Sequence, residues 1–198
     1  MNGLASIGAD LLRLTVTDPR AAARRVIGIG AGLGTDVLWL ALVLLTALST
    51  LLSHLVLVTV PVPDGAEAAG MFGIGPIAMA GLQLALMAGF VLAVAAIGRR
   101  AGGNGDLTGA LSIILWLEVL ALGLQAAQVV LLAFGPGLAD MIGLAGVILF
   151  WTLLSFFVAE LHGFRSVGRV FLGIALTVLI AAFAISLLLL LMGVQIGL

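Results

Sequence analysis

A polar stripe runs along one face of the otherwise apolar segment of residues 107–134. Glu118 lies about 16 Å along a helix that begins at Leu107, which places it near the middle of a hydrocarbon layer about 30 Å thick. Gln125 follows seven residues later on the same helical face, and Gln128 lies slightly round from it. Ionisable groups at this depth are costly and often functional, so the stripe is the first candidate site.

His54, in the apolar segment 35–60, is a candidate partner for this stripe. It lies about 27 Å from the start of its segment, and Gln125 lies about 27 Å from Leu107, so the two side chains are expected at similar depth. Two interpretations are open. Glu118, Gln125 and His54 form a proton-responsive network or a notch for a lipid headgroup, or Glu118 is a neutral, hydrogen-bonded acid that fixes helix register. No second acid lies near this depth, which favours the register interpretation.

Motifs for other chemistry are missing. The glycine run of residues 28–34 does not satisfy GxGxxG, and a chain without lysine has no P-loop. The absence of cysteine excludes disulfides, thiolate catalysis and cysteine-based metal sites. His54 and His162 lie towards opposite membrane faces, which excludes a two-histidine metal site. We therefore expect no enzymatic activity, no metal, no cofactor and no nucleic-acid partner.

Composition indicates that the solvent of this chain is lipid. Hydrophobic residues make up 63% of the 198 residues and charged residues 9%, and the mean hydropathy is +1.37, so a soluble domain would lack a polar surface. Five continuous apolar runs each exceed the roughly 20 residues needed to cross a bilayer as a helix. We predict an all-α, polytopic five-helix transmembrane bundle over residues 35–198. Its spans are expected at about 35–60, 74–98, 107–134, 138–161 and 167–193, the first of them stopped by Pro61 and Pro63.

Residues 1–34 are predicted to be a cytoplasmic N-terminal segment with a short amphipathic helix. Asp18 and Pro19 are typical of an N-cap followed by a proline at the first helical position. From Pro19 to Ile29, arginines gather on one helical side and apolar residues on another, which is typical of a helix that lies on a membrane surface. The alternative is a juxtamembrane helix that only orients the first span.

The arginines predict the orientation. All eight basic residues lie before the first span, between the second and third, or between the fourth and fifth, whereas the loops of residues 61–73 and 135–137 carry none. The positive-inside rule then places the N-terminus in the cytoplasm and the C-terminus on the far side. A second candidate site, a cytoplasmic anchor or docking site in which Glu160 could pair with Arg165, comprises Arg20, Arg24, Arg25, Glu160, His162 and Arg165.

Small residues recur every four positions along the second predicted span. Gly81, Ala85, Gly89 and Ala93 form a small-xxx-small ladder, a pattern that allows helices to approach closely. We expect this ladder to pack against another helix of the same chain. A dimer face is the alternative.

Three stretches resemble the Yip1 domain family, especially its bacterial members, and the resemblance extends over about residues 11–190. They are Leu14-Thr-Val-Thr-Asp-Pro-Arg20, the glycine-rich turn Gly102-Gly-Asn-Gly-Asp-Leu-Thr-Gly-Ala-Leu111, and Trp151 to Gly163 followed by Ser166-Val-Gly-Arg169. The resemblance implies five spans and, for bacterial members, a multi-pass protein of the bacterial inner membrane. Eukaryotic members bind Rab GTPases, but this chain lacks their DLYGP-type N-terminal motif and has no tyrosine, so Rab binding is not carried over.

The leading functional hypothesis is a non-enzymatic inner-membrane protein that organises membrane lipid or a membrane protein complex. Its expected partners are membrane lipids and either another membrane protein or a second copy of itself. One alternative is a small transporter, channel or lipid scramblase that uses the stripe around Glu118, for which flux in liposomes would fall on Glu118→Leu. The other is an accessory subunit of a larger membrane complex.

Overall fold

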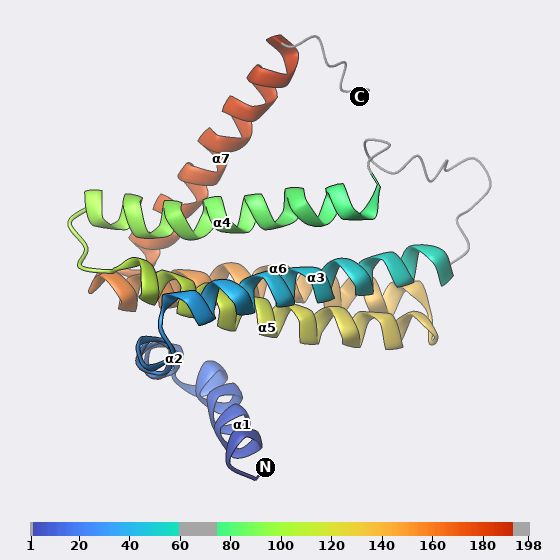
Figure 1. Ribbon diagram of the computed structural model, residues 1–198, viewed down its shortest axis with the longest axis horizontal. Helices are drawn as coiled ribbons and strands as arrows, with labels where there is room; N and C mark the ends of the chain where they lie inside the picture. Colours follow the sequence, from blue (N-terminus) through green and yellow to red (C-terminus); the bar gives the residue numbers. More distant parts are fainter. Residues whose placement is uncertain (1, 60–74, 192–198) are drawn as a thin grey trace.

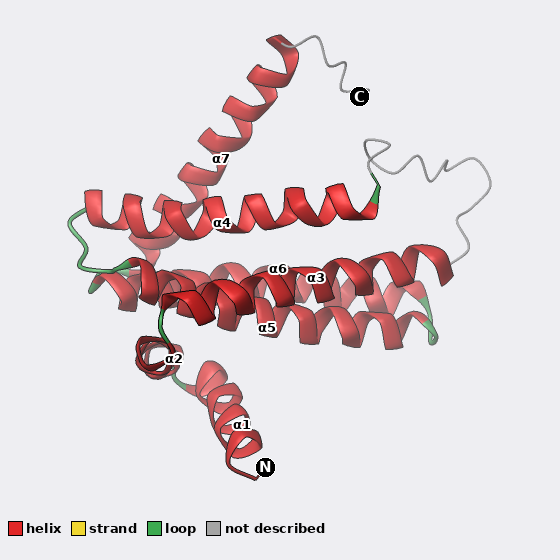
Figure 2. Ribbon diagram, in the orientation of Figure 1, coloured by secondary structure: helices red, strands yellow, loops and turns green. Residues whose placement is uncertain are grey.

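The computed structural model describes residues 2–59 and 75–191, and within them the chain folds into seven α-helices with no strand (Figures 1 and 2). Five of these helices are long and apolar enough to cross a membrane. The chain is therefore an all-α, multi-pass membrane protein, as its composition predicts. The spanning helices are α3 (Thr35–Thr59), α4 (Pro76–Arg100), α5 (Leu107–Leu132), α6 (Pro136–His162) and α7 (Val167–Leu191).

Local sequence signals account for several helix ends. Asp106 caps α5, because its Oδ1 accepts a hydrogen bond from the N–H of Gly109 at 2.8 Å. Pro136 occupies the first position of α6, where its missing N–H costs nothing. Gly163 ends α6 with a φ of 72°, a left-handed conformation that glycine adopts freely. The predicted bounds differ from these helices by about two residues. The stop at Pro61 and Pro63, the loop of residues 61–73 and the end of the fifth span lie outside the described residues.

Two further helices, α1 (Asn2–Thr17) and α2 (Pro19–Leu33), precede the spans. Asp18 caps α2 as predicted, accepting from the N–H of Ala21 at 3.0 Å. However, α2 does not rest freely on a surface. It packs across α5 and α6 and buries Ala22, Ala23, Val26 and Gly30 against them (Figure 1). Ala22 and Val26, on the apolar side expected to face lipid, are instead buried against the protein, whereas Ile29 of that side is exposed.

α5 is the central helix, in contact with α2, α3, α4 and α6. Leu117 of α5 and Leu42, Val91 and Phe157 of its neighbours belong to the core, each at most 1% exposed. α3 and α5 run parallel, since Thr35 and Thr108 share a hydrogen bond near their starts and Ser53 and Gln125 share one farther along both helices. α7 packs on α6 and diverges from α4 in Figure 1. At one end of the bundle, α4 and α6 end and α5 and α7 begin. We call it the arginine end, because Arg99, Arg100, Arg165 and Arg169 lie there.

The glycine run of residues 28–34 belongs to α2 and its following turn, and one of its members permits close helix packing. A Cβ at Gly30 would collide with the side chain of Ser112 on α5, whereas a Cβ at Gly28 would meet no atom within 4 Å. Gly30 is therefore the glycine of this run that allows α2 to pack closely on α5.

We predict that Gly30→Ala destabilises the protein by about 1–3 kcal/mol, because Ser112 and α2 must move apart. The matched control is Gly28→Ala in the same helix, which should be neutral or stabilise by up to about 1 kcal/mol through helix propensity. Thermal unfolding of the detergent-solubilised protein measures both. Equal transition temperatures for the two variants would contradict the proposed packing of α2.

Candidate functional site

The polar stripe on α5 is divided between two neighbouring helices. Nε2 of Gln125 donates to Oγ of Ser53 at 2.6 Å, and Oε1 of Gln125 accepts from Oγ of Ser49 at 3.2 Å, so Gln125 faces α3. Nε2 of Gln128 donates to the carbonyl oxygen of Ala139 at 3.3 Å, so Gln128 faces α6. The stripe is thus a set of interhelical hydrogen bonds rather than one continuous polar surface.

His54 does not join this network in the described part of the chain. It is exposed, one position after Ser53, and it makes no hydrogen bond with Glu118 or Gln125. A helix turns about 100° per residue, so a side chain next to Ser53 points away from α5. This angular offset explains why the expected network does not form. Equal depth of two residues in the membrane does not determine which neighbouring helix each side chain faces.

Glu118 is buried, with 6% of its surface exposed. It lies seven residues before Gln125, and Thr46 lies seven residues before Ser53, so Glu118 and Thr46 occupy equivalent positions of the parallel pair α5 and α3. Thr46 is 2% exposed, and within the described residues its hydroxyl has no hydrogen-bond partner. Thr46 was missed at the sequence level, although its heptad spacing from Ser53 was available as a signal.

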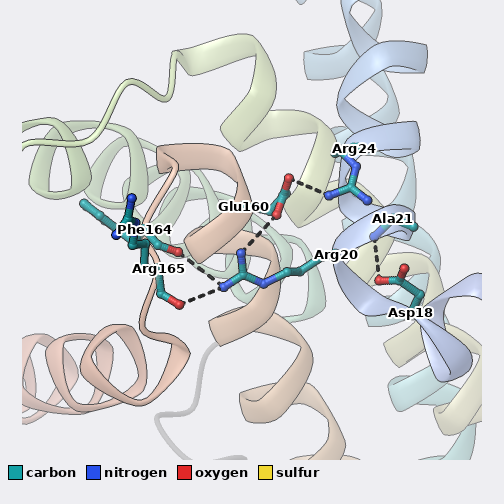
Figure 3. A network of polar contacts seen from close by, with 7 residues as sticks. All are labelled: Asp18, Arg20, Ala21, Arg24, Glu160, Phe164 and Arg165. Carbon is teal, nitrogen blue, oxygen red and sulfur yellow. Dashed lines mark hydrogen bonds and ion pairs between the residues drawn. The ribbon is translucent and has the colours of Figure 1, made fainter.

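The arginine end contains a carboxylate that two arginines share (Figure 3). Oε1 of Glu160 accepts from Arg24 at 2.9 Å, and Oε2 accepts from Arg20 at 3.4 Å. Arg20 also donates to the backbone carbonyls of Phe164 and Arg165, at 3.3 and 3.1 Å. The hydrogen bond to Glu160 raises the pKa of the Arg24 guanidinium above its ordinary value. α2 is therefore tied to the end of α6 and to the turn that leads into α7.

The members of the predicted anchor thus have different surroundings. Glu160 pairs with Arg20 and Arg24 instead of Arg165, because α2 lies across α6 and brings its arginines to the carboxylate. Arg25 forms an ion pair with Asp10 on α1 at 3.7 Å. These contacts hold parts of the chain together, and the docking of a partner at this cluster stays a prediction.

His162 lies in a socket made by the turn between α4 and α5. Its ring is buried, with 1% of the residue exposed, and Nδ1 accepts from the N–H of Gly105 at 3.1 Å. Nε2 therefore carries the hydrogen and donates to the carbonyl of Val94 at 3.1 Å. The ring approaches the backbone so closely that a Cβ at Gly98, Gly103 or Gly105 would collide with it. His162 joins α4, α5 and α6 at the arginine end.

A groove of about 930 Å³ lies between α4 and α7. Its α4 wall includes Ala85, Gly89 and Ala93, three members of the small-residue ladder. A Cβ at Gly81 or Gly89 would meet nothing within 4 Å, so these glycines do not pack closely on another helix of the described chain. The expected packing within the chain is therefore not found, because α7 diverges from α4 and leaves the ladder open.

The groove carries positive charge at the arginine end. Arg165 and Arg169 line it there, next to Gly98 and Ala101. Farther along, its lining is almost wholly apolar, and Thr177 is the polar side chain among residues such as Ile174, Val178, Ala181 and Ile185. A smaller cavity of about 280 Å³ between α5 and α6 is lined by Gln128 and apolar residues, without a charged side chain. The larger groove is the candidate functional site.

The family model described as the Yip1 domain matches residues 13–190. This chain belongs to the Yip1 domain family. The matched residues begin in α1 and end in α7, so the Yip1 domain includes the whole groove and the ion pairs of Glu160. The Yip1 family is not known as an enzyme family, and the match gives no indication for or against catalysis in this chain. Comparisons with curated proteins and with solved structures gave no match.

The groove of this Yip1 domain was not found at the sequence level. In the sequence, Arg169 indicates orientation and belongs to a stretch that resembles the Yip1 family, and the ladder on α4 predicts packing within the chain. The available signal was the combination of an arginine pair at the start of one apolar helix with a small-residue face on another. What the sequence does not show is that α7 stands apart from α4.

We predict that His162→Ala destabilises this Yip1 domain by about 2–5 kcal/mol, because it leaves a cavity and removes the partners of Gly105 and Val94. The control is His54→Ala at an exposed position, with an expected change within about 0.5 kcal/mol. Unfolding of both variants in mixed micelles measures the difference. Similar losses of stability in the two variants would show that the socket does not hold the three helices together.

Proposed function

We propose that this Yip1-family protein is a non-enzymatic membrane protein that organises lipid by binding it in the groove between α4 and α7. The observation that carries the proposal is an open apolar groove whose one end is lined by Arg165 and Arg169. Its volume of about 930 Å³ lies within the range of roughly 300–1,000 Å³ typical of ligand sites. Hydrocarbon is the surrounding solvent, so an acyl chain is the occupant that requires no desolvation of a polar group.

The length of the groove suits an acyl chain. From Ile97 to Ala85 its α4 wall extends about 18 Å, at 1.5 Å per residue. Half of a hydrocarbon layer about 30 Å thick is about 15 Å, the depth of one leaflet. A lipid whose headgroup lies at Arg165 and Arg169 would therefore place its chains along the wall formed by Gly89 and its neighbours. With the positive-inside rule, that leaflet is the cytoplasmic one.

A second copy of the chain is a less suitable occupant. Two copies with the same orientation in the membrane would be related by a two-fold axis along the membrane normal, which brings equivalent residues to the same depth. A symmetric contact through the groove would therefore bring the Arg165 and Arg169 pairs of both copies close together. Like charges at such a distance repel each other, which favours an anionic or zwitterionic lipid over a dimer.

The location of the groove supports a role in organising lipid. α7 packs on α6, whereas α4 packs mainly on α3 and α5. A lipid between α4 and α7 would therefore contact two helices that leave a groove between them. Transport through the stripe around Glu118 has less support, because its glutamines are hydrogen-bonded to α3 and α6 and His54 lies outside it. Assembly into a larger complex and location in a bacterial inner membrane stay predictions.

We predict that Gly89→Leu lowers the amount of phospholipid retained per protein by about tenfold, because the leucine side chain would occupy the acyl-chain path. A tenfold change in affinity corresponds to about 1.4 kcal/mol of binding free energy. Gly123→Leu is the matched control, since Gly123 is an exposed glycine of α5 outside the groove whose added Cβ meets no atom within 4 Å. Native mass spectrometry after delipidating detergent washes gives the lipid-to-protein ratio. Equal retention by both variants and the wild type would overturn the proposal.

A further inference from the structure

We propose that the lipid in the groove is an anionic phospholipid, and that Arg165 and Arg169 bind its phosphate headgroup. This inference rests on the proposed function, because it names the headgroup of the lipid that the groove is proposed to hold. Both arginines are exposed, and both line the groove at the arginine end. One arginine follows the end of α6 and the other lies in the first turn of α7, four positions apart in the chain.

The two arginines have no acidic partner of their own within residues 2–59 and 75–191. The nearby carboxylate, that of Glu160, is shared by Arg20 and Arg24, which reach it from α2. Within the described residues, the guanidinium group of neither arginine forms an ion pair or a hydrogen bond; Arg165 accepts from Arg20 through its backbone carbonyl, and Arg169 donates to Ser166 through its backbone N–H. The docking of α2 therefore leaves two positive charges uncompensated at one end of an apolar groove.

The backbone next to these charges is held in place. Arg20 donates to the carbonyls of Phe164 and Arg165, so the turn before α7 is attached to α2. The ring of Phe164, which lines the groove, is stacked on the buried ring of His162 with centroids 5.6 Å apart. A site whose backbone is fixed before the ligand arrives loses less conformational entropy on binding.

Charge and apolar surface together specify one class of ligand. Guanidinium groups bind phosphate oxygens through charge-assisted, often bidentate hydrogen bonds. Basic pockets between transmembrane helices on the cytoplasmic side are suited to anionic lipid headgroups. Because the same groove continues from the arginines along apolar walls, the phosphate must belong to a molecule with hydrocarbon chains rather than to a free ion.

The test is a competition between two phospholipids with identical chains, phosphatidylglycerol and phosphatidylcholine, for the full-length protein, measured by native mass spectrometry. The wild type is expected to prefer phosphatidylglycerol by about 25-fold, at roughly 1 kcal/mol or fivefold for each arginine near the surface. Arg165→Gln with Arg169→Gln should abolish the preference but keep the binding of phosphatidylcholine. The control pair Arg13→Gln with Arg100→Gln removes the same charge from two exposed residues outside the groove and should keep the preference.

The outcomes separate this inference from the proposed function. Equal binding of the two lipids by the wild type, or an equal loss of preference in both double variants, overturns the headgroup assignment and leaves lipid binding intact. If the wild type binds neither lipid, or forms a dimer without bound lipid, the proposed function itself is overturned. Glycerol phosphate without chains should not displace the bound lipid at equal concentration. Full displacement of the lipid by glycerol phosphate would show that the site recognises phosphate alone, and would overturn the assignment of a lipid as its ligand.

Discussion

Lipid tails are as apolar as the helices they surround, so burial of apolar side chains gives a membrane bundle little reason to hold together. Close approach through small residues and buried polar contacts must supply the association instead. At the arginine end, Gly30 lets α2 approach α5, and the glycines around His162 let its ring hydrogen-bond to the backbone of Val94 and Gly105. Deeper in the bundle, Gln125 joins α5 to α3.

The same constraint explains why a groove exists. The α4 face that contains Gly89 has the small residues needed for close packing, but α7 carries no polar side chain that hydrogen-bonds to α4 in the described part of the chain. α7 packs on α6, and its departure from α4 leaves the small residues facing open space (Figure 1). The small side chains of this wall thus leave an open groove instead of a helix contact.

Charge distribution connects the docked N-terminal helices to the groove. A carboxylate can neutralise about one arginine, and at Glu160 that capacity is used by two guanidinium groups from α2. Arg165, in the following turn, forms no ion pair within the described residues. α2 also holds that turn through the carbonyls of Phe164 and Arg165 (Figure 3). A helix that looked like a membrane-surface anchor therefore shapes the electrostatics of a site between two other helices.

The sequence by itself determined the helical class, the spans and the cap at Asp18, because hydropathy over about 20 residues and local capping chemistry depend only on neighbouring residues. It also predicted that Gln125 faces the interior of the bundle, and the structure places this half-buried side chain against α3. The tertiary structure decided which helices meet. Glu160 pairs with α2 instead of Arg165, Ser53 lies beside Gln125 instead of His54, and no helix of the described residues packs closely on Gly89. Those outcomes depend on the rotation and tilt of whole helices. Packing between segments distant in the sequence sets both, and local sequence patterns do not encode them.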